Sequence, residues 1–144
     1  MKGTNTYEER NSIPNNQGED IFLEWCHGKG LNVRRLGFDE KNAPVERFYD
    51  LPYFIRNLPD FLVTSSEKTT LVNVKGSLNL KEQEYQKLDQ IRELFESETC
   101  KLYYAFCLPS GIIWANTDKV KDAYRLSEKQ GVWPDGKVYR RLAL

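Results

Sequence analysis

The chain has 144 residues, a length typical of one globular domain that buries roughly two thirds of its unfolded surface. Its 21 Lys and Arg residues balance 21 Asp and Glu residues, which argues against a strongly basic nucleic-acid-binding protein. The sequence has no apolar run of membrane-spanning length and no signal-peptide pattern, so we expect a soluble, cytoplasmic protein with no membrane partner. The three cysteines lack metal-ligand spacing, and we expect reduced, mostly buried thiols.

The first predicted helix spans residues 18–29 and follows a polar lead at residues 1–17 that has no hydrophobic periodicity. At 100° per residue, Glu19 falls on the same inward stripe as Phe22 and Cys26. A carboxylate in the first helical turn is favoured by the helix dipole. The residues alone therefore leave two interpretations open for Glu19, a dipole-stabilising residue or an extra ligand.

A first strand is predicted at residues 31–38, where Arg34 and Arg35 point to opposite faces, so that at most one of them faces a site. Residues 39–58 form a polar connection that is too aromatic for a disordered linker. We expect a short helix or turn near residues 51–57.

Two strands joined by a short turn are predicted next, at residues 59–65 and 69–75. Asp60 opens the first, and Asn73 and Lys75 share one face of the second because side chains alternate along a strand. This pattern places a carboxylate, an amide oxygen and an ammonium close together. Such a trio suits a divalent metal beside a phosphate, with Asp60 as a charged oxygen ligand, Asn73 as a neutral one and Lys75 as the cation for the phosphate or the attacking water. However, Asp after Pro is common at the start of a strand, and a strand that ends in Lys-Gly is ordinary.

The clearest periodicity predicts a helix over residues 80–98, with Asn79 as its N-cap. Gln83 lies in its first turn, on a polar edge with Lys87 and Gln90. A glutamine at this place can orient a metal-bound water or hold a phosphate, and it can equally be a solvated helix residue.

The C-terminal part is predicted to contain strands at residues 101–107 and 111–116, a short helix that Thr117 caps, and a final strand at residues 137–144. Charge is distributed unevenly along the chain. The first hundred residues carry 13 basic and 17 acidic residues, whereas the remainder carries 8 and 4. A basic C-terminal third beside an acidic metal site is compatible with a phosphate-bearing substrate, and so is an ordinary mixed surface.

The strand pair resembles the PD-(D/E)XK nuclease superfamily, because Pro59-Asp60 is followed after a hairpin-length gap by Asn73-Val74-Lys75-Gly76. Glu19, with Gly30-Leu31 eleven residues later, is similar to the pattern of archaeal Holliday junction resolvases and phage endonuclease I enzymes. Glu82-Gln83 is similar to the Glu-Gln pair that often opens the helix after the lysine strand in these nucleases.

The resemblance implies an α/β fold with a single-domain, restriction-endonuclease-like core, in which helices flank a central mixed β-sheet. The expected element order is α-β-β-β-α-β-β, followed by a short C-terminal helix and strand. Residues 1–17 are then a polar arm and residues 18–144 a nuclease-like domain, with the core at 18–116 and a C-terminal extension at 117–144.

The resemblance also implies a metal-dependent DNA endonuclease that hydrolyses phosphodiester bonds, with branched DNA as the favoured substrate and roles in DNA recombination and repair. Asp60, Asn73 and the Val74 carbonyl would hold Mg²⁺ or Mn²⁺, with Glu19 in the outer shell or at a second metal. Lys75 would stabilise charge on the phosphate, and Gln83 would complete the catalytic set. A homodimer is implied by analogy with the resolvases.

Asn73 departs from the family pattern, which has Asp or Glu at this position. Three explanations stay open: an amide that works with weaker metal affinity, an inactivated chain in which Asn replaces its isostere Asp, or a degenerate nuclease that binds without cutting. A binding module that grips DNA or a protein partner is therefore the alternative function. The two differ in metal dependence, since only an enzyme needs Asp60 as a metal ligand.

Overall fold

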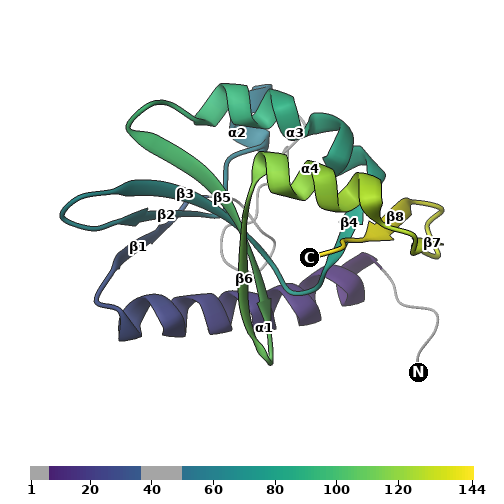
Figure 1. Ribbon diagram of the computed structural model, residues 1–144, viewed down its shortest axis with the longest axis horizontal. Coiled ribbons are helices and arrows are strands. Elements are labelled where there is room, and N and C mark those ends of the chain that lie inside the picture. The colour runs from purple at the N-terminus through teal and green to yellow at the C-terminus, as the bar shows by residue number, and fades with distance from the viewer. Residues whose placement is uncertain (1–6, 37–49) are drawn as a thin grey trace.

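The structure is a computed structural model that describes residues 7–36 and 50–144, with side chains described from residue 17 onward. A five-stranded sheet forms the centre, with one long helix on one face and two helices on the other (Figure 1). The helices and strands are α1 (Tyr7–Gly28), β1 (Asn32–Arg35), α2 (Tyr53–Arg56), β2 (Phe61–Thr64), β3 (Thr69–Lys75), β4 (Asn79–Lys81), α3 (Glu82–Phe95), β5 (Cys100–Leu108), β6 (Gly111–Asn116), α4 (Thr117–Leu126), β7 (Gln130–Val132) and β8 (Val138–Arg141).

The central sheet has the strand order β1-β2-β3-β5-β6. Only β3 and β5 are parallel, and every other neighbouring pair is antiparallel. Parallel neighbours need a long crossover connection, which β4 and α3 provide here. The sheet is therefore mixed and flanked by helices, as expected from the sequence.

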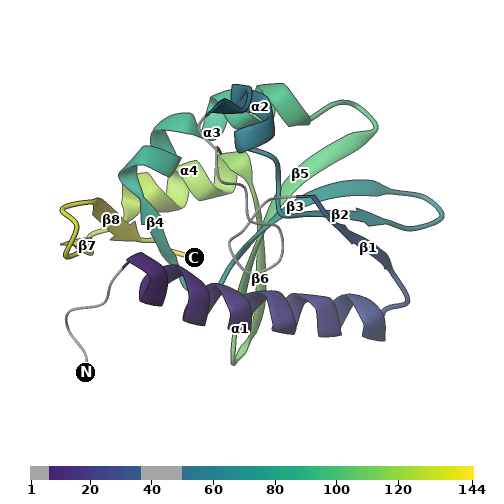
Figure 2. The ribbon, with the colours of Figure 1, turned by 180° about the vertical axis from the view of Figure 1, so that it is seen from behind.

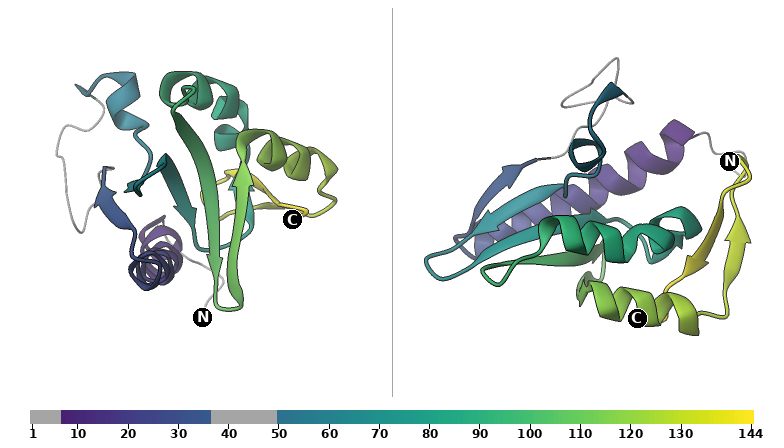
Figure 3. Two further views of the ribbon diagram at one scale, coloured as in Figure 1. Left: turned by 60° about the vertical axis from the view of Figure 1, so that its left-hand side comes forward. Right: turned by 90° about the horizontal axis from the view of Figure 1, so that it is seen from above.

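Alternation along β3 assigns its side chains to two different layers. Val72 and Val74 are buried in a cluster with Phe22 and Cys26 of α1. The opposite face of the sheet packs under α3 and α4, where Phe106 and other side chains form a second core. The end-on view in Figure 3 shows α1 on one side of the sheet and α3 and α4 on the other. Lys75 thus leaves the sheet on the α3 side.

A second, three-stranded sheet with the order β4-β8-β7 lies beside the start of α3 (Figure 2). Neither β4 nor β7 is predicted from the sequence, because each has only three residues. Strand β4 also pairs with β8, about sixty residues later in the chain. Their partner β8 lies within the predicted final strand. Leu80 of β4 is fully buried, so this small sheet closes one end of the second core.

Three predicted helix starts are wrong. Helix α1 begins at Tyr7 and so includes most of the lead that was expected to be non-helical, while residues 1–6 lie outside the described residues. Helix α3 begins at Glu82 because Asn79 belongs to β4, and its N-cap is Lys81. The side chain that caps α4 belongs to Asn116, whose amide oxygen accepts a hydrogen bond from the Lys119 N–H at 2.9 Å. The division into an arm and a domain stays a prediction.

Other expectations agree with the structure. Strands β3 and β6 have the predicted bounds, and the short helix α2 lies within residues 51–57. Cys26 and Cys107 are buried thiols, Cys100 is partly buried, and burial raises the pKa of Cys26 to about 11 and that of Cys107 to about 12. None of the described helices combines the length and the apolar character needed to cross a membrane.

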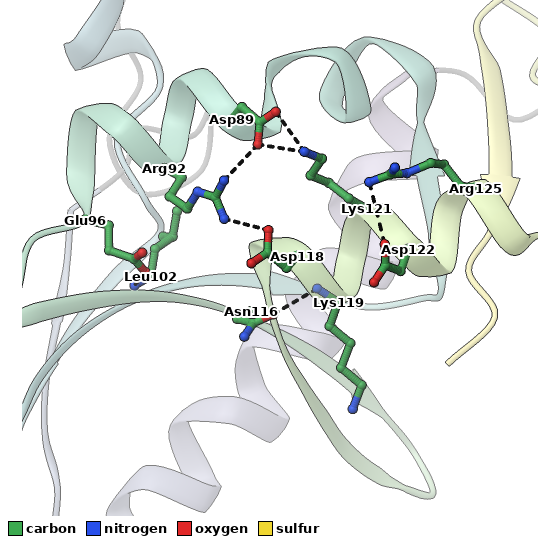
Figure 4. Close-up of polar contacts among 10 residues, drawn as sticks. All are labelled: Asp89, Arg92, Glu96, Leu102, Asn116, Asp118, Lys119, Lys121, Asp122 and Arg125. Carbon is green, nitrogen blue, oxygen red and sulfur yellow. Dashed lines mark hydrogen bonds and ion pairs between the residues drawn. The ribbon is translucent and has the colours of Figure 1, made fainter.

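Helices α3 and α4 are joined at the surface by a network of ion pairs (Figure 4). The Lys121 ammonium donates to both carboxylate oxygens of Asp89, at 2.9 and 2.8 Å. Arg92 reaches Asp118 at 2.7 Å and Asp89 at 3.1 Å. Each cation therefore connects one helix to the other, in addition to the apolar contacts beneath.

Replacing Asp89 by Asn removes the negative charge that Lys121 and Arg92 share. We expect the melting temperature to fall by a few degrees at low ionic strength. The decrease in melting temperature should be smaller in about 1 M salt, because the Debye length there is about 3 Å and surface ion pairs are screened. Asp122→Asn is the matched control, because Asp122 lies 3.6 Å from Arg125 and joins no second helix. Equal effects of the two variants, measured by thermal unfolding, would contradict a stabilising network.

Candidate active site

Asp60 lies where β2 begins, at the point where β3 continues past the end of its neighbour. The Val74 N–H donates a hydrogen bond of 2.8 Å to Asp60 Oδ2. The Leu36 N–H donates one of 2.9 Å to the backbone carbonyl of Asp60. Because Pro59 and Phe61 on either side are almost fully buried, the backbone cannot shift easily. The carboxylate is thus fixed against the edge of β3.

Lys75 and Glu84 form an ion pair between the last residue of β3 and the first turn of α3. Glu84 is the third residue of the helix, and its carboxylate also accepts a hydrogen bond from the backbone N–H of the N-cap residue Lys81. This second contact is half of a capping box, which explains why α3 starts without a capping Ser, Thr, Asp or Asn. Glu84 therefore joins the helix start to the end of β3.

The pKa values show that these charges act on one another. Burial raises the pKa of Asp60 to about 6, the carboxylates of Glu19 and Glu84 add to the rise, and the Val74 N–H and Lys75 oppose it. Burial also disfavours the charged form of Lys75, but the Glu84 carboxylate outweighs it and the pKa of Lys75 is raised. The pKa of Glu84 is lowered, since Lys75 and then Lys81 outweigh its burial. Lys75 and Glu84 are thus both ionised at neutral pH.

Glu19 approaches from α1. Its Oε1 accepts a 2.7 Å hydrogen bond from Nη2 of Arg35, the arginine of β1 that faces the site, whereas Arg34 is exposed. The guanidinium of Arg35 also lies over the Phe61 ring, with Cζ 4.9 Å from the ring centroid. The prediction that only one of the two arginines faces the site is confirmed. Glu19 is close enough to raise the pKa of Asp60, so it lies within the same electrostatic environment.

A close approach of two backbones brings α1 to this position. Gly18 is buried, and a Cβ added to it would lie 2.9 Å from the Cα of Gly76. Real Cβ atoms essentially never come so close to a backbone atom. Glycine at position 18 therefore lets α1 pass directly over the end of β3, one residue before Glu19 and one residue after Lys75.

Two predicted site residues have other surroundings. The Asn73 side chain hydrogen bonds the hydroxyl of Tyr104, the residue opposite it on β5. Burial raises the pKa of Tyr104 to about 12, so this hydroxyl stays protonated. Gln83 is exposed in the first turn of α3, next to the ion-paired Glu84. The structure thus brings Asp60, Lys75 and Glu19 into one environment, and it gives Asn73 a partner on β5.

The positive charge of a divalent cation would suit this edge of the sheet. Burial makes ionisation of the Asp60 carboxyl unfavourable and the carboxylates of Glu19 and Glu84 add to this effect, whereas a bound cation would oppose it. The carbonyl of Val74 lies on the same side of β3 as its N–H, which points at Asp60. Among residues 17–36 and 50–144, no group of three or more His, Cys, Asp or Glu side chains could hold a metal ion. A cation would therefore depend on neutral oxygens as well as Asp60.

Sequence reasoning missed Glu84. The signal was present, because Glu84 lies four residues before Leu88 and seven before Ile91, on the buried stripe of the helix. The resemblance to the nucleases involves the adjacent Glu82-Gln83 pair and not Glu84. A carboxylate on a buried helical stripe needs a partner, and Lys75 is that partner.

Comparison with protein-family models finds no match, and comparison with curated proteins finds none either. Among solved structures, the chain is similar to Hjc, a Holliday junction resolvase from the archaeal hyperthermophile Archaeoglobus fulgidus. The alignment covers 86% of this chain and 85% of that chain, with 15% identity and a TM-score of 0.46. Likeness at this level does not decide function, which has to be inferred from the side chains of this chain.

The close approach at Gly18 predicts a specific cost. Gly18→Ala forces α1 away from Gly76, and we expect a loss of about 1–3 kcal/mol in the free energy of unfolding. Gly28→Ala is the matched control, because a Cβ there meets nothing within 4 Å and alanine is the better helix former. That control should be neutral or stabilising by up to about 1 kcal/mol in the same denaturant titration. Similar losses in both variants would contradict the role of Gly18.

The raised pKa of Asp60 predicts how stability changes with pH. The folded chain holds this proton up to about pH 6, whereas the ordinary pKa of an aspartate carboxyl is 3.8. The stabilisation is therefore complete below the lower value and is lost as the pH rises through the higher one. Asn at position 60 carries no charge. We thus expect Asp60→Asn to be more stable than the parent chain at pH 8 by about 2 kcal/mol, with little difference near pH 4.

The measurement is denaturant unfolding at several pH values with EDTA present. Glu67→Gln, in the exposed turn between β2 and β3, is the control and should leave the profile of the parent chain unchanged. A constant difference between Asp60→Asn and the parent chain at all pH values would show that the ionisation of Asp60 carries no such cost.

Proposed function

We propose that this chain is a metal-dependent endonuclease that hydrolyses phosphodiester bonds in DNA. One observation carries the proposal: the carboxylate of Asp60 is held at the edge of β3 with a raised pKa, beside the ionised pair of Lys75 and Glu84. A structural ion pair does not require a third carboxylate kept in an unfavourable state next to it. Strongly perturbed carboxylates of this kind are typical of functional sites.

Asp60, the Val74 carbonyl and the Asn73 side chain would hold Mg²⁺ or Mn²⁺, with Glu19 nearby. When bound, the metal polarises a phosphodiester oxygen and lowers the pKa of a water molecule. For Asn73 to act as a ligand, its side chain would share or leave the hydrogen bond with Tyr104. The neutral amide at this position lowers the charge of the site and hence its affinity for the metal.

Lys75 contributes charge rather than proton transfer. Its raised pKa keeps the ammonium protonated, which suits the stabilisation of negative charge on a phosphate and excludes a general base at neutral pH. Glu84 holds this ammonium in place from α3. Glu84 also supplies, beside Lys75, an acidic side chain that position 73 lacks.

The second candidate function is a module that binds DNA or a protein partner without cutting. It is favoured by the Asn73 side chain, which already has a hydrogen-bond partner in Tyr104. It is also favoured by the pairing of Glu19 with Arg35, which a ligand role for Glu19 would have to replace. In this case Asp60→Ala would keep the function.

The test is cleavage of an end-labelled four-way DNA junction and a matched linear duplex, with Mg²⁺ or Mn²⁺ and with EDTA. The junction is included because Glu19 and Gly30-Leu31 resemble the pattern of junction resolvases. We expect metal-dependent cutting that Asp60→Ala abolishes. Asn73→Asp adds a charged ligand and should lower the metal concentration needed for half-maximal cutting.

Two neighbouring substitutions in α3 separate the assignments for its first turn. Glu84→Gln removes the charge that holds Lys75, and we expect cutting to fall about a hundredfold. Gln83→Ala, at the adjacent exposed position, should have little effect unless Gln83 has the catalytic role that the family resemblance implies. Absence of cutting by the parent chain and by Asn73→Asp, with DNA binding retained in Asp60→Ala, would replace the nuclease by the binding module. Gel filtration with light scattering would test the predicted homodimer.

A further inference from the structure

A hollow of about 350 Å³ lies between α3, α4 and the inner face of the small sheet, apart from Asp60 and Lys75. The side chains around its mouth are mostly polar: Glu82, Gln86, Arg125, Gln130 and Arg140. Tyr85 and the almost fully buried Tyr124 supply aromatic surface. Strand alternation explains this lining, because Leu80, Arg140 and Gln130 stand opposite one another in a row across β4, β8 and β7.

Two tyrosine rings stack on each other in this hollow, and a guanidinium contacts one of them. The rings of Tyr85 and Tyr124 lie 4.0 Å apart between centroids and are inclined by only 12°. On Tyr124, the guanidinium of Arg140 lies with Cζ 4.7 Å from the ring centroid. Arg140 Nη1 also donates a 3.1 Å hydrogen bond to the backbone carbonyl of Tyr124. The guanidinium is therefore held in position before any ligand arrives, which reduces the entropic cost of binding.

Among residues 17–36 and 50–144, no carboxylate forms an ion pair with the cation at this position. Arg140 is half-buried and forms no ion pair with any carboxylate of the described residues, and Arg125 reaches only Asp122, at 3.6 Å. The side-chain amides of Gln86 and Gln130 are exposed and form no hydrogen bond with any of the residues that the structure describes. A positioned guanidinium with remaining N–H donors favours an oxyanion, above all a phosphate. Glu82 at the mouth limits how much negative charge the hollow tolerates.

We propose that this hollow binds a nucleotide that carries a single phosphate group. The base packs against the Tyr85 side of the stack, and its polar edge hydrogen bonds the amides of Gln86 and Gln130 and the carboxylate of Glu82. The phosphate pairs with Arg140 and Arg125. The nucleotide is either a free mononucleotide or an unpaired nucleotide of a DNA strand, since both present the same base and phosphate.

Nucleotide binding does not depend on phosphodiester cleavage. The first turns of α3 present Glu84 to Lys75 of β3, while Glu82, Tyr85 and Gln86 line the hollow. Binding can thus be measured with EDTA present, where a metal-dependent nuclease is inactive. A failed cleavage experiment would leave the binding result unaffected, and a failed binding experiment would leave the cleavage result unaffected.

The experiment is calorimetric titration of the full chain with deoxynucleoside 5′-monophosphates in EDTA. The matching nucleosides and inorganic phosphate are titrated alone for comparison. We expect the monophosphates to bind more tightly than either part. Arg140→Gln and Arg125→Ala should each weaken binding about tenfold or more, because each removes a charge-assisted contact to phosphate. Arg141→Gln is the matched control, since Arg141 is exposed and adjacent on the opposite face of β8.

Circular dichroism of each variant checks that it is folded. If Arg140→Gln does not fold, Arg125→Ala still tests the proposal, because the exposed Arg125 holds no core residue in place. Competition with a short single-stranded oligonucleotide distinguishes the two sources. If the oligonucleotide displaces the bound monophosphate, the natural ligand is a nucleotide of a DNA strand. If the monophosphate stays bound, the natural ligand is a free mononucleotide. The proposal is overturned if the monophosphates do not bind at millimolar concentration, or if Arg141→Gln weakens binding as much as Arg125→Ala.

Discussion

The backbone contact between Gly18 and Gly76 is the constraint on which the candidate site depends. It allows α1 to cross β3 without side chains between them, so that Phe22 and Cys26 can pack on Val72 and Val74 further along the strand. The same contact places Glu19 next to the point where Lys75 leaves the sheet. A larger residue at position 18 would separate the helix from the sheet, and with it one carboxylate from the others. The packing of α1 on β3 and the position of the Glu19 carboxylate therefore both depend on the close approach of Gly18 to Gly76.

At this edge of the sheet, charges of opposite sign come from four different elements. Glu19 of α1 is paired with Arg35 of β1, and Lys75 of β3 with Glu84 of α3. Asp60 is the remaining carboxylate, and its ionised form has the Val74 N–H and the partly shared Lys75 to stabilise it. The charges within each pair neutralise each other, whereas burial makes ionisation of the Asp60 carboxyl unfavourable. A cation bound there would remove the imbalance, which is why the proposed chemistry is centred on this residue rather than on the pairs.

Local patterns in the sequence predicted the elements that have a strong period of their own. The alternation of β3 and the pairing of Asp60 with a neighbouring lysine strand could be predicted, because both depend on residues close together in the chain. The small sheet could not, since β4 has three residues and is defined by pairing with β8, about sixty residues later. Because β4 was not predicted, the predicted start of α3 is too early in the chain. With Asn79 as cap, Glu84 did not fall at the third helical position, where a glutamate caps the backbone.

The start of α3 connects the two sites that we infer, and the spacing of its residues keeps them separate. Glu84 shares the buried stripe of Leu88 and Ile91 and turns toward β3, whereas Tyr85 continues toward Tyr124 of α4. Successive helical residues differ by about 100° in direction, so adjacent positions can serve different neighbours. The surface ion pairs of Asp89 with Lys121 and of Arg92 with Asp118 fix α4 against the same helix (Figure 4). The orientation of α3 therefore determines both where the Lys75 ammonium is held and how the tyrosine stack is closed.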